Sequence, residues 1–130
     1  MATVEIDTET FAKTIRENDM VLIDFWADWC GPCKMFGPVF ERSSEQHGDV
    51  VHAKLDTDAN AQLVGSLGIQ GIPTLMAFRD GVQVFNQAGA LPAKALEEIV
   101  TAVKSLNMDE VRARLAKSDG GTIGDQVRQA

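Results

Sequence analysis

Cys30 and Cys33 are the only two cysteines of this 130-residue chain, and both stand in the stretch FWADWCGPCK at residues 25 to 34. Two thiols at this spacing have three uses in proteins. They bind a metal ion, form a permanent structural disulfide, or open and close a disulfide as part of a reaction. The residues around the pair help to distinguish these uses.

A zinc site would need further ligands, and His47 and His52 complete a two-cysteine, two-histidine spacing pattern with the pair. A zinc finger of this type carries both histidines on one helix. Here Gly48 and Asp49 interrupt the expected helix between the histidines, and His52 falls within the apolar segment VVHAKL. We therefore expect no metal at the cysteine pair.

A permanent disulfide across so few residues would add little stability, because loop-closure entropy is smallest for the shortest loops. A redox role has positive support, since a helix is expected to begin near Cys33 and the free N–H groups of a helix start stabilise a thiolate. Lowering a thiol pKa by one unit requires only about 1.4 kcal/mol. We expect Cys30 to attack disulfides, and Cys33, in the first helical turn and more buried, to resolve the mixed disulfide.

The elements that must position these cysteines follow from the hydrophobic pattern. Short apolar runs at 20–27 and 50–57 are typical of strands buried on both faces of a sheet. Helices are predicted at 33–47, 59–67 and 91–106, and Asp80-Gly81 indicates a tight hairpin between two antiparallel strands. The order β α β α β α β β α predicts an α/β fold with a central mixed sheet flanked by helices on both faces.

Asp24 stands in the middle of the apolar run MVLIDFWA. A carboxylate in a buried strand loses its hydration, which disfavours the charged form and raises the pKa. We therefore expect Asp24 to be buried and to titrate above the usual range of an aspartate.

Composition indicates one soluble globular domain, with 45% hydrophobic and 24% charged residues. The formal net charge of −7 would repel a phosphate backbone, so we expect no nucleic-acid partner. The first residues lack a signal-peptide pattern, and no apolar run approaches the roughly 20 residues that span a bilayer. We expect a cytoplasmic protein without membrane association, in which residues 1–106 form the domain and residues 107–130 a C-terminal extension, a short helix followed by a mobile tail.

The chain resembles the thioredoxin family over about residues 1–106. The matching segments, in the family's order, are DFWA at 24–27, WCGPCK at 29–34, GIPT at 71–74, DG at 80–81 and GA at 89–90. The resemblance implies the thioredoxin fold and reduction of protein disulfides by exchange with the Cys30–Cys33 pair. It also implies re-reduction by thioredoxin reductase, an NADPH-dependent flavoprotein. We expect a monomer that needs no bound cofactor.

The resemblance further implies roles for residues outside the pair. Asp24 would lie below Cys33 and act as the base that helps to deprotonate it, while Lys54 would lie nearby and modulate the charge of Asp24. A cis peptide bond before Pro73 would lie beside the disulfide. The rim that docks protein substrates would comprise Trp29, Gly31, Pro32, Ile72, Pro73, Gly89 and Ala90.

The chain departs from the family pattern at Gly37, a helical position where the family more often has alanine, and in the extension from residue 107 onward. Two alternatives stay open. An oxidant or isomerase on the same fold would need a more stable thiolate, although such proteins more often place histidine between the cysteines. A non-enzymatic binding or assembly module would hold its partner through the extension.

Overall fold

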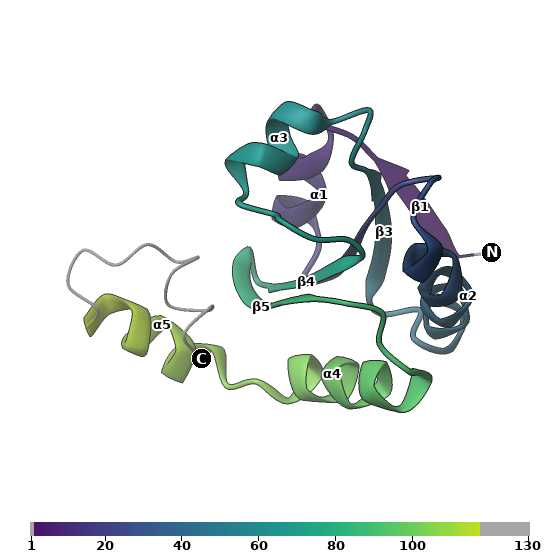
Figure 1. Ribbon diagram of the computed structural model, residues 1–130. Coiled ribbons are helices and arrows are strands. Elements are labelled where there is room, and N and C mark those ends of the chain that lie inside the picture. The colour runs from purple at the N-terminus through teal and green to yellow at the C-terminus, as the bar shows by residue number, and fades with distance from the viewer. Residues whose placement is uncertain (1, 118–130) are drawn as a thin grey trace.

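The computed structural model describes residues 2–117 and contains a five-stranded mixed sheet between two layers of helices (Figure 1). The strands are β1 (Thr3–Ile6), β2 (Met20–Trp26), β3 (Val51–Asp56), β4 (Thr74–Arg79) and β5 (Val82–Ala88). The helices are α1 (Phe11–Glu17), α2 (Gly31–Gln46), α3 (Ala61–Ser66), α4 (Ala93–Ser105) and α5 (Met108–Lys117). The predicted fold class and order of elements are confirmed.

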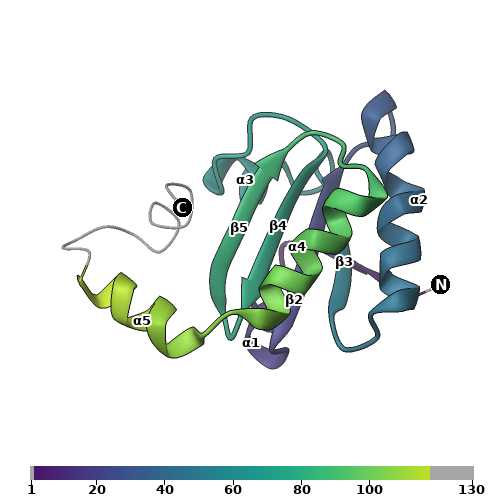
Figure 2. The ribbon, with the colours of Figure 1, turned by 90° about the horizontal axis from the view of Figure 1, so that it is seen from below.

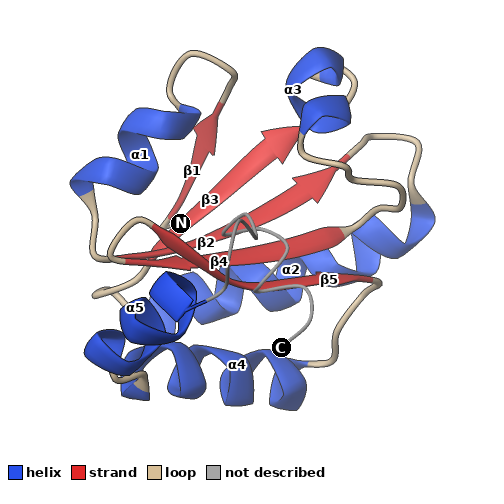
Figure 3. Ribbon diagram, turned by 90° about the vertical axis from the view of Figure 1, so that its left-hand side faces the viewer, coloured by secondary structure: helices blue, strands red, loops and turns tan. Residues whose placement is uncertain are grey.

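The strands follow the order β1-β3-β2-β4-β5, with β1, β3 and β2 parallel and β4 antiparallel to both of its neighbours. The central position of β2 explains its continuous apolar run, because both of its faces are covered. Met20 pairs with Arg79 and Phe25 with Thr74. The β4–β5 turn therefore lies at the opposite end of the sheet from the end where β2 and β3 finish (Figure 3).

Helices α1 and α3 cover one face of the sheet, and α2 and α4 cover the other (Figure 3). Alternate residues of each strand point to opposite faces, so the sheet divides the core into two clusters. Buried side chains on the α1 and α3 side include Ile23, Phe25, Leu55 and Met76. Those on the α2 and α4 side include Leu22, Phe36, Phe40, Leu96 and Val100.

The turn between β4 and β5 has the backbone that the sequence predicts. Asp80 has a φ of 52° and Gly81 a φ of 81°. Two consecutive residues with positive φ are what a tight hairpin turn of the primed type requires, and aspartate and glycine tolerate that conformation better than most residues.

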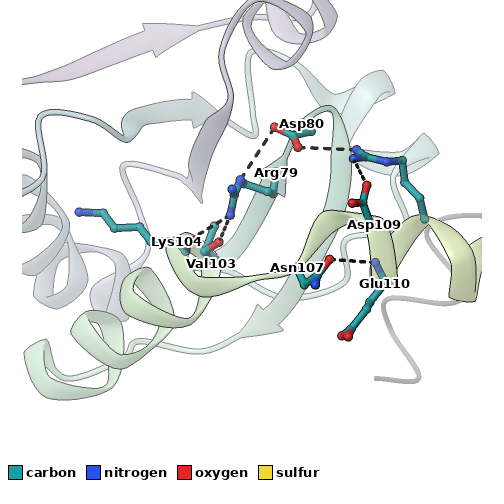
Figure 4. Close-up of polar contacts among 8 residues, drawn as sticks. Arg79, Asp80, Val103, Lys104, Asn107, Asp109 and Glu110 are labelled. Carbon is teal, nitrogen blue, oxygen red and sulfur yellow. Dashed lines mark hydrogen bonds and ion pairs between the residues drawn. The ribbon is translucent and has the colours of Figure 1, made fainter.

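Helix α5 is the short helix expected after residue 107, and it lies on the side of the molecule away from α2 (Figures 1 and 2). The side chain of Asn107 caps it by accepting a hydrogen bond from the backbone N–H of Glu110. Met108 is buried, and Arg112 pairs with Asp80 of the hairpin turn at 3.6 Å (Figure 4). The mobile tail expected beyond this helix falls outside the described residues, and the domain boundary at residue 106 stays a prediction.

Arg79 joins the hairpin to the end of α4. Its guanidinium donates hydrogen bonds to the carbonyl oxygens of Val103, at 2.7 Å, and Lys104, at 3.2 Å (Figure 4). The last carbonyls of a helix have no partner within the helix, so a cationic donor at this position satisfies them and complements the helix dipole. Within residues 2–117, no helix is both long enough and apolar enough to cross a membrane.

Candidate active site

Cys30 and Cys33 are joined by a disulfide at the start of α2. Cys30 is the N-cap residue of this helix, and its Sγ accepts a hydrogen bond from the backbone N–H of Cys33 at 3.2 Å. Pro32 occupies the first turn, where a missing N–H removes no helical hydrogen bond. The sulfur of Cys30 therefore receives both a direct hydrogen bond and the positive end of the helix dipole, and both favour a thiolate.

The two cysteines do not differ in burial as expected. Cys30 is 3% exposed and Cys33 is 6% exposed, so the prediction that Cys33 is the more buried of the two is wrong. The reason lies in the loop before β4, because Ile72 packs over the disulfide and its carbonyl oxygen lies 3.7 Å from the Sγ of Cys30. The hydrogen bond from α2, rather than exposure, distinguishes the two sulfurs.

Three segments that are distant in the sequence meet at the disulfide. The peptide bond between Ile72 and Pro73 is cis, which confirms that expectation. The backbone N–H of Gly89 donates to the carbonyl oxygen of Pro73 at 2.8 Å, and this brings the GA segment beside the cis bond. Gly89 has a φ of 110°, a conformation that favours glycine.

The residues of the expected docking rim differ in exposure. Ile72 is half-buried, and Pro73 is buried, so its ring is not itself part of the exposed surface. The exposed members are Trp29, Gly31, Pro32, Gly89 and Ala90.

Sequence reasoning missed two residues, Asp58 and Met35. The indole N–H of Trp29, a side chain that is 70% exposed, donates to the carboxylate of Asp58 at 3.0 Å. Met35, in the second turn of α2, is 74% exposed. Asp58 could have been found from topology, since it follows β3 as Trp29 follows β2, and parallel neighbours end at the same edge. The exposure of Met35 could have been predicted only from its position on the outer face of the amphipathic helix α2.

Asp24 is completely buried, as expected, and no protein group within residues 2–117 donates a hydrogen bond to either of its carboxyl oxygens. Burial raises the pKa of Asp24 from 3.8 to about 7, while the Lys54 ammonium lowers this pKa and the charge of Glu5 raises it. Asp24 therefore changes its charge near neutral pH.

Lys54 lies opposite Asp24 in the register of β2 and β3. Its Nζ lies 5.4 Å from the centroid of the Trp26 ring, a cation–π distance. Helix α2 approaches closely at Gly37, where an added Cβ would lie 3.9 Å from the same Nζ. The structure thus brings Lys54 beside Asp24, and the roles of both in the reaction stay predictions.

The two histidines are engaged elsewhere. Both ring nitrogens of buried His52 form hydrogen bonds, one with Ser43 Oγ and one with the carbonyl oxygen of Val50, and burial lowers its pKa. His47 contacts Glu97 and Lys104. Among the described residues, no group of three or more His, Cys, Asp or Glu side chains is placed to hold a metal ion.

Comparisons with known proteins agree with this geometry. A model of the Thioredoxin family matches residues 2–102. Putative thioredoxin 2 of Streptomyces coelicolor is 50% identical over 116 residues, which cover 89% of this chain and 87% of that protein. Thioredoxin of Bacillus subtilis is 42% identical over 101 residues, covering 77% of this chain and 96% of that protein. The solved structure of a mutant thioredoxin from Halobacterium salinarum superposes with a TM-score of 0.75 at 39% identity, covering 81% of this chain and 93% of that chain.

The family match includes the disulfide, the buried Asp24 and the loop around Pro73. The chemistry of such a disulfide at a helix start is thiol–disulfide exchange. This chain therefore belongs to the thioredoxin family of thiol–disulfide oxidoreductases.

Proposed function

We propose that this chain reduces disulfide bonds of other proteins and is itself re-reduced by NADPH-dependent thioredoxin reductase. The observation that carries the proposal is the disulfide at the start of α2, where the backbone N–H of Cys33 contacts the Sγ of Cys30. This arrangement suits a disulfide reductant, because the sulfur that attacks a substrate disulfide must be a thiolate.

The reaction takes two exchanges. In the dithiol form, the Cys30 thiolate attacks one sulfur of a substrate disulfide, which forms a mixed disulfide and releases the other substrate sulfur as a thiolate that takes up a proton. The Cys33 sulfur then attacks Cys30 Sγ, which closes the intramolecular disulfide and releases the second substrate thiol. Two electrons pass from the dithiol to the substrate, and the reductase returns them from NADPH.

Asp24 is proposed to accept the proton of Cys33 in the second exchange. A base works best when its pKa lies near the operating pH, and burial places the pKa of Asp24 at about 7. Lys54 would modulate this base by its positive charge, since the two residues face each other across neighbouring strands.

Substrates would dock on the exposed rim around the disulfide. Trp29 supplies the largest exposed apolar surface there, and the Gly89 backbone lies beside the cis bond. We propose that the backbone of Ile72 pairs with an extended segment of the substrate, a common way of recognising a peptide by its main chain.

Turnover with the reductase tests the whole proposal. Purified protein, thioredoxin reductase and NADPH should reduce insulin disulfides, followed by NADPH absorbance and insulin precipitation. The Cys30→Ser variant should be inactive. Failure of the wild-type protein, or retained activity in the variant, would contradict the proposal.

An equilibrium redox titration separates a reductant from an oxidant or isomerase on the same fold. A reductant should have a potential near that of thioredoxin, about −270 mV, whereas strongly oxidising disulfide oxidoreductases lie near about −120 mV. A potential near about −120 mV would instead assign this chain to the oxidants.

The location and assembly of the protein stay predictions. The cytoplasm keeps thiols reduced and suits a dithiol reductant. Size-exclusion chromatography with light scattering tests the expected monomer. The alternative of a binding module predicts that removal of residues 107–130 abolishes association with a partner and leaves insulin reduction intact. The ion pair between Arg112 of α5 and Asp80 connects this helix to the β4–β5 hairpin, which gives α5 a structural role that needs no partner protein.

A further inference from the structure

Three charged residues lie side by side across three neighbouring strands. Glu5 of β1 is opposite Lys54 of β3, and Lys54 is opposite Asp24 of β2. Partners in register on neighbouring strands point to the same face of a sheet. The strands lie in the order β1, β3, β2 (Figure 3), so the lysine is placed between two carboxylates.

The face that these residues share is the one covered by α2. Thr3, two positions before Glu5, hydrogen-bonds to Glu41 of α2. An added Cβ at Gly37 of the same helix would contact Lys54 Nζ. The distance of 3.9 Å is an ordinary van der Waals contact, so α2 lies beside the lysine side chain at this position.

Lys54 forms no hydrogen bond with Asp24 in this structure. Both Asp24 oxygens lack a hydrogen-bond partner among the described residues, and the Lys54 Nζ instead lies over the Trp26 ring. A lysine has a long side chain, so small rotations about its bonds bring the ammonium toward either neighbouring strand.

The electrostatics connect all three residues. Partial burial raises the pKa of Glu5 while Lys54 lowers it, and Lys54 likewise lowers the pKa of Asp24. Asp56 raises the pKa of Glu5, and Glu41 is the further acid that α2 brings to this face. One cation therefore acts on two carboxylates that differ in degree of burial, since Asp24 is completely buried and Glu5 is only partly covered.

We propose that Glu5 competes with Asp24 for the Lys54 ammonium and thereby keeps Asp24 a strong enough base to accept the proton of Cys33. This rests on the proposed role of Asp24 in the second exchange. A cation held close to a carboxylate stabilises its charged form and weakens it as a base. Sharing the cation with Glu5 limits that effect, so Glu5 acts as a positioning residue at a distance from the sulfur atoms.

The Glu5→Gln variant tests the competition directly. The substitution keeps the shape of the side chain and removes its charge, so Lys54 should act more on Asp24 and the Asp24 pKa should fall. Direct repulsion between unit charges roughly 10 Å apart in water would by itself account for about 0.3 pH unit, so competition for Lys54 predicts a fall larger than this. Carbon-13 NMR of the Asp24 carboxyl measures it in the oxidised protein, where the cysteines do not titrate.

Two further sets of variants distinguish competition for Lys54 from direct repulsion between Glu5 and Asp24. Glu9→Gln makes the same charge change in the exposed turn before α1 and should leave the Asp24 titration unchanged. In a Lys54→Gln background, Glu5→Gln should shift the Asp24 pKa much less than in the wild-type background. Equal shifts in the two backgrounds, or no shift with Lys54 present, would overturn the proposal.

The rate of the second exchange tests the role of Asp24 separately. The acid limb of its pH profile, followed by stopped-flow after the mixed disulfide forms, should move to lower pH in Glu5→Gln by the same amount as the NMR titration. A shifted titration with an unchanged rate profile would support the competition for Lys54 and contradict the role proposed for Asp24.

Discussion

The two ends of the sheet differ in how their polar side chains are hydrogen-bonded. At the end where β2 leads into α2, both oxygens of buried Asp24 and the indole N–H of Trp26 have no hydrogen-bond partner among residues 2–117. At the other end, Arg79 caps the carbonyls of α4, and Asp80 pairs with Arg112 of α5 (Figure 4).

The difference follows from what each end does. A base that titrates near neutral pH requires an environment that does not fully stabilise its charge, and such groups cluster at reactive sites. The hairpin end holds α4 and α5 in place and gains from every hydrogen bond that it forms. Four substitutions test this contrast.

The largest effect is expected at the disulfide itself. In Cys33→Ser, the first exchange should still occur, but no sulfur is present to resolve the mixed disulfide. Turnover should therefore stop while a covalent adduct with a disulfide substrate accumulates, detected by mass spectrometry. Cys30→Ser is the matched control and should form no adduct. Adducts on Cys33 in that control would reverse the assignment of attacking and resolving thiols.

Asp24→Asn should stabilise the protein above neutral pH. Because the folded state holds a proton on Asp24 more tightly than the unfolded state does, the contribution of Asp24 to wild-type stability falls as pH rises from about 4 to about 7 and then levels off. A pKa raised from 3.8 to about 7 corresponds to roughly 4 kcal/mol, so the variant should gain up to that amount at pH 8 and little below pH 4.

Urea unfolding of the oxidised protein between pH 4 and pH 8 measures this gain. Asp28→Asn, at an exposed position close in sequence, serves as the control and should follow the wild-type curve. If the free energy of unfolding depended on pH in the same way for wild type and Asp24→Asn, the pKa of Asp24 would not be raised by folding, which would contradict the prediction.

Arg79→Met should destabilise the hairpin end. The change removes two charge-assisted hydrogen bonds to the end of α4 and keeps an apolar side chain of similar length, so a loss of about 1.5 to 3 kcal/mol is expected. Insulin reduction should be unchanged, because Arg79 lies at the far end of the sheet. Arg79→Lys should lose less stability than Arg79→Met, because it keeps a cationic donor. A slower insulin reduction in Arg79→Met would contradict the expected independence of the two ends of the sheet.

The smallest effect is expected for Arg112→Ala. Exposed ion pairs contribute about 0 to 1 kcal/mol and weaken with salt, so the variant should loosen α5 without affecting the core. Amide hydrogen exchange should speed up in α5 alone, and more at low ionic strength. Arg114→Ala in the same helix is the control. Equal effects of the two variants would show that the Asp80 contact does not hold α5.

Sequence patterns predicted most of the fold, because the deciding forces act over short segments. The apolar run of β2 and the Asp80-Gly81 turn each carry their own signal, and the burial of Asp24 followed from its apolar neighbours. The zinc spacing shows the limit of such signals. His52 fits the pattern along the chain, yet its ring is engaged by Ser43 and Val50 inside the core.

The sequence by itself determined the order of elements, the position of the disulfide at a helix start and the buried carboxylate, since each depends on neighbouring residues. Only the tertiary structure decided that Ile72 covers Cys30, that Asp58 holds Trp29 and that Lys54 lies between Glu5 and Asp24. Strand order and register set these contacts, and both depend on how distant segments pack together rather than on any local pattern.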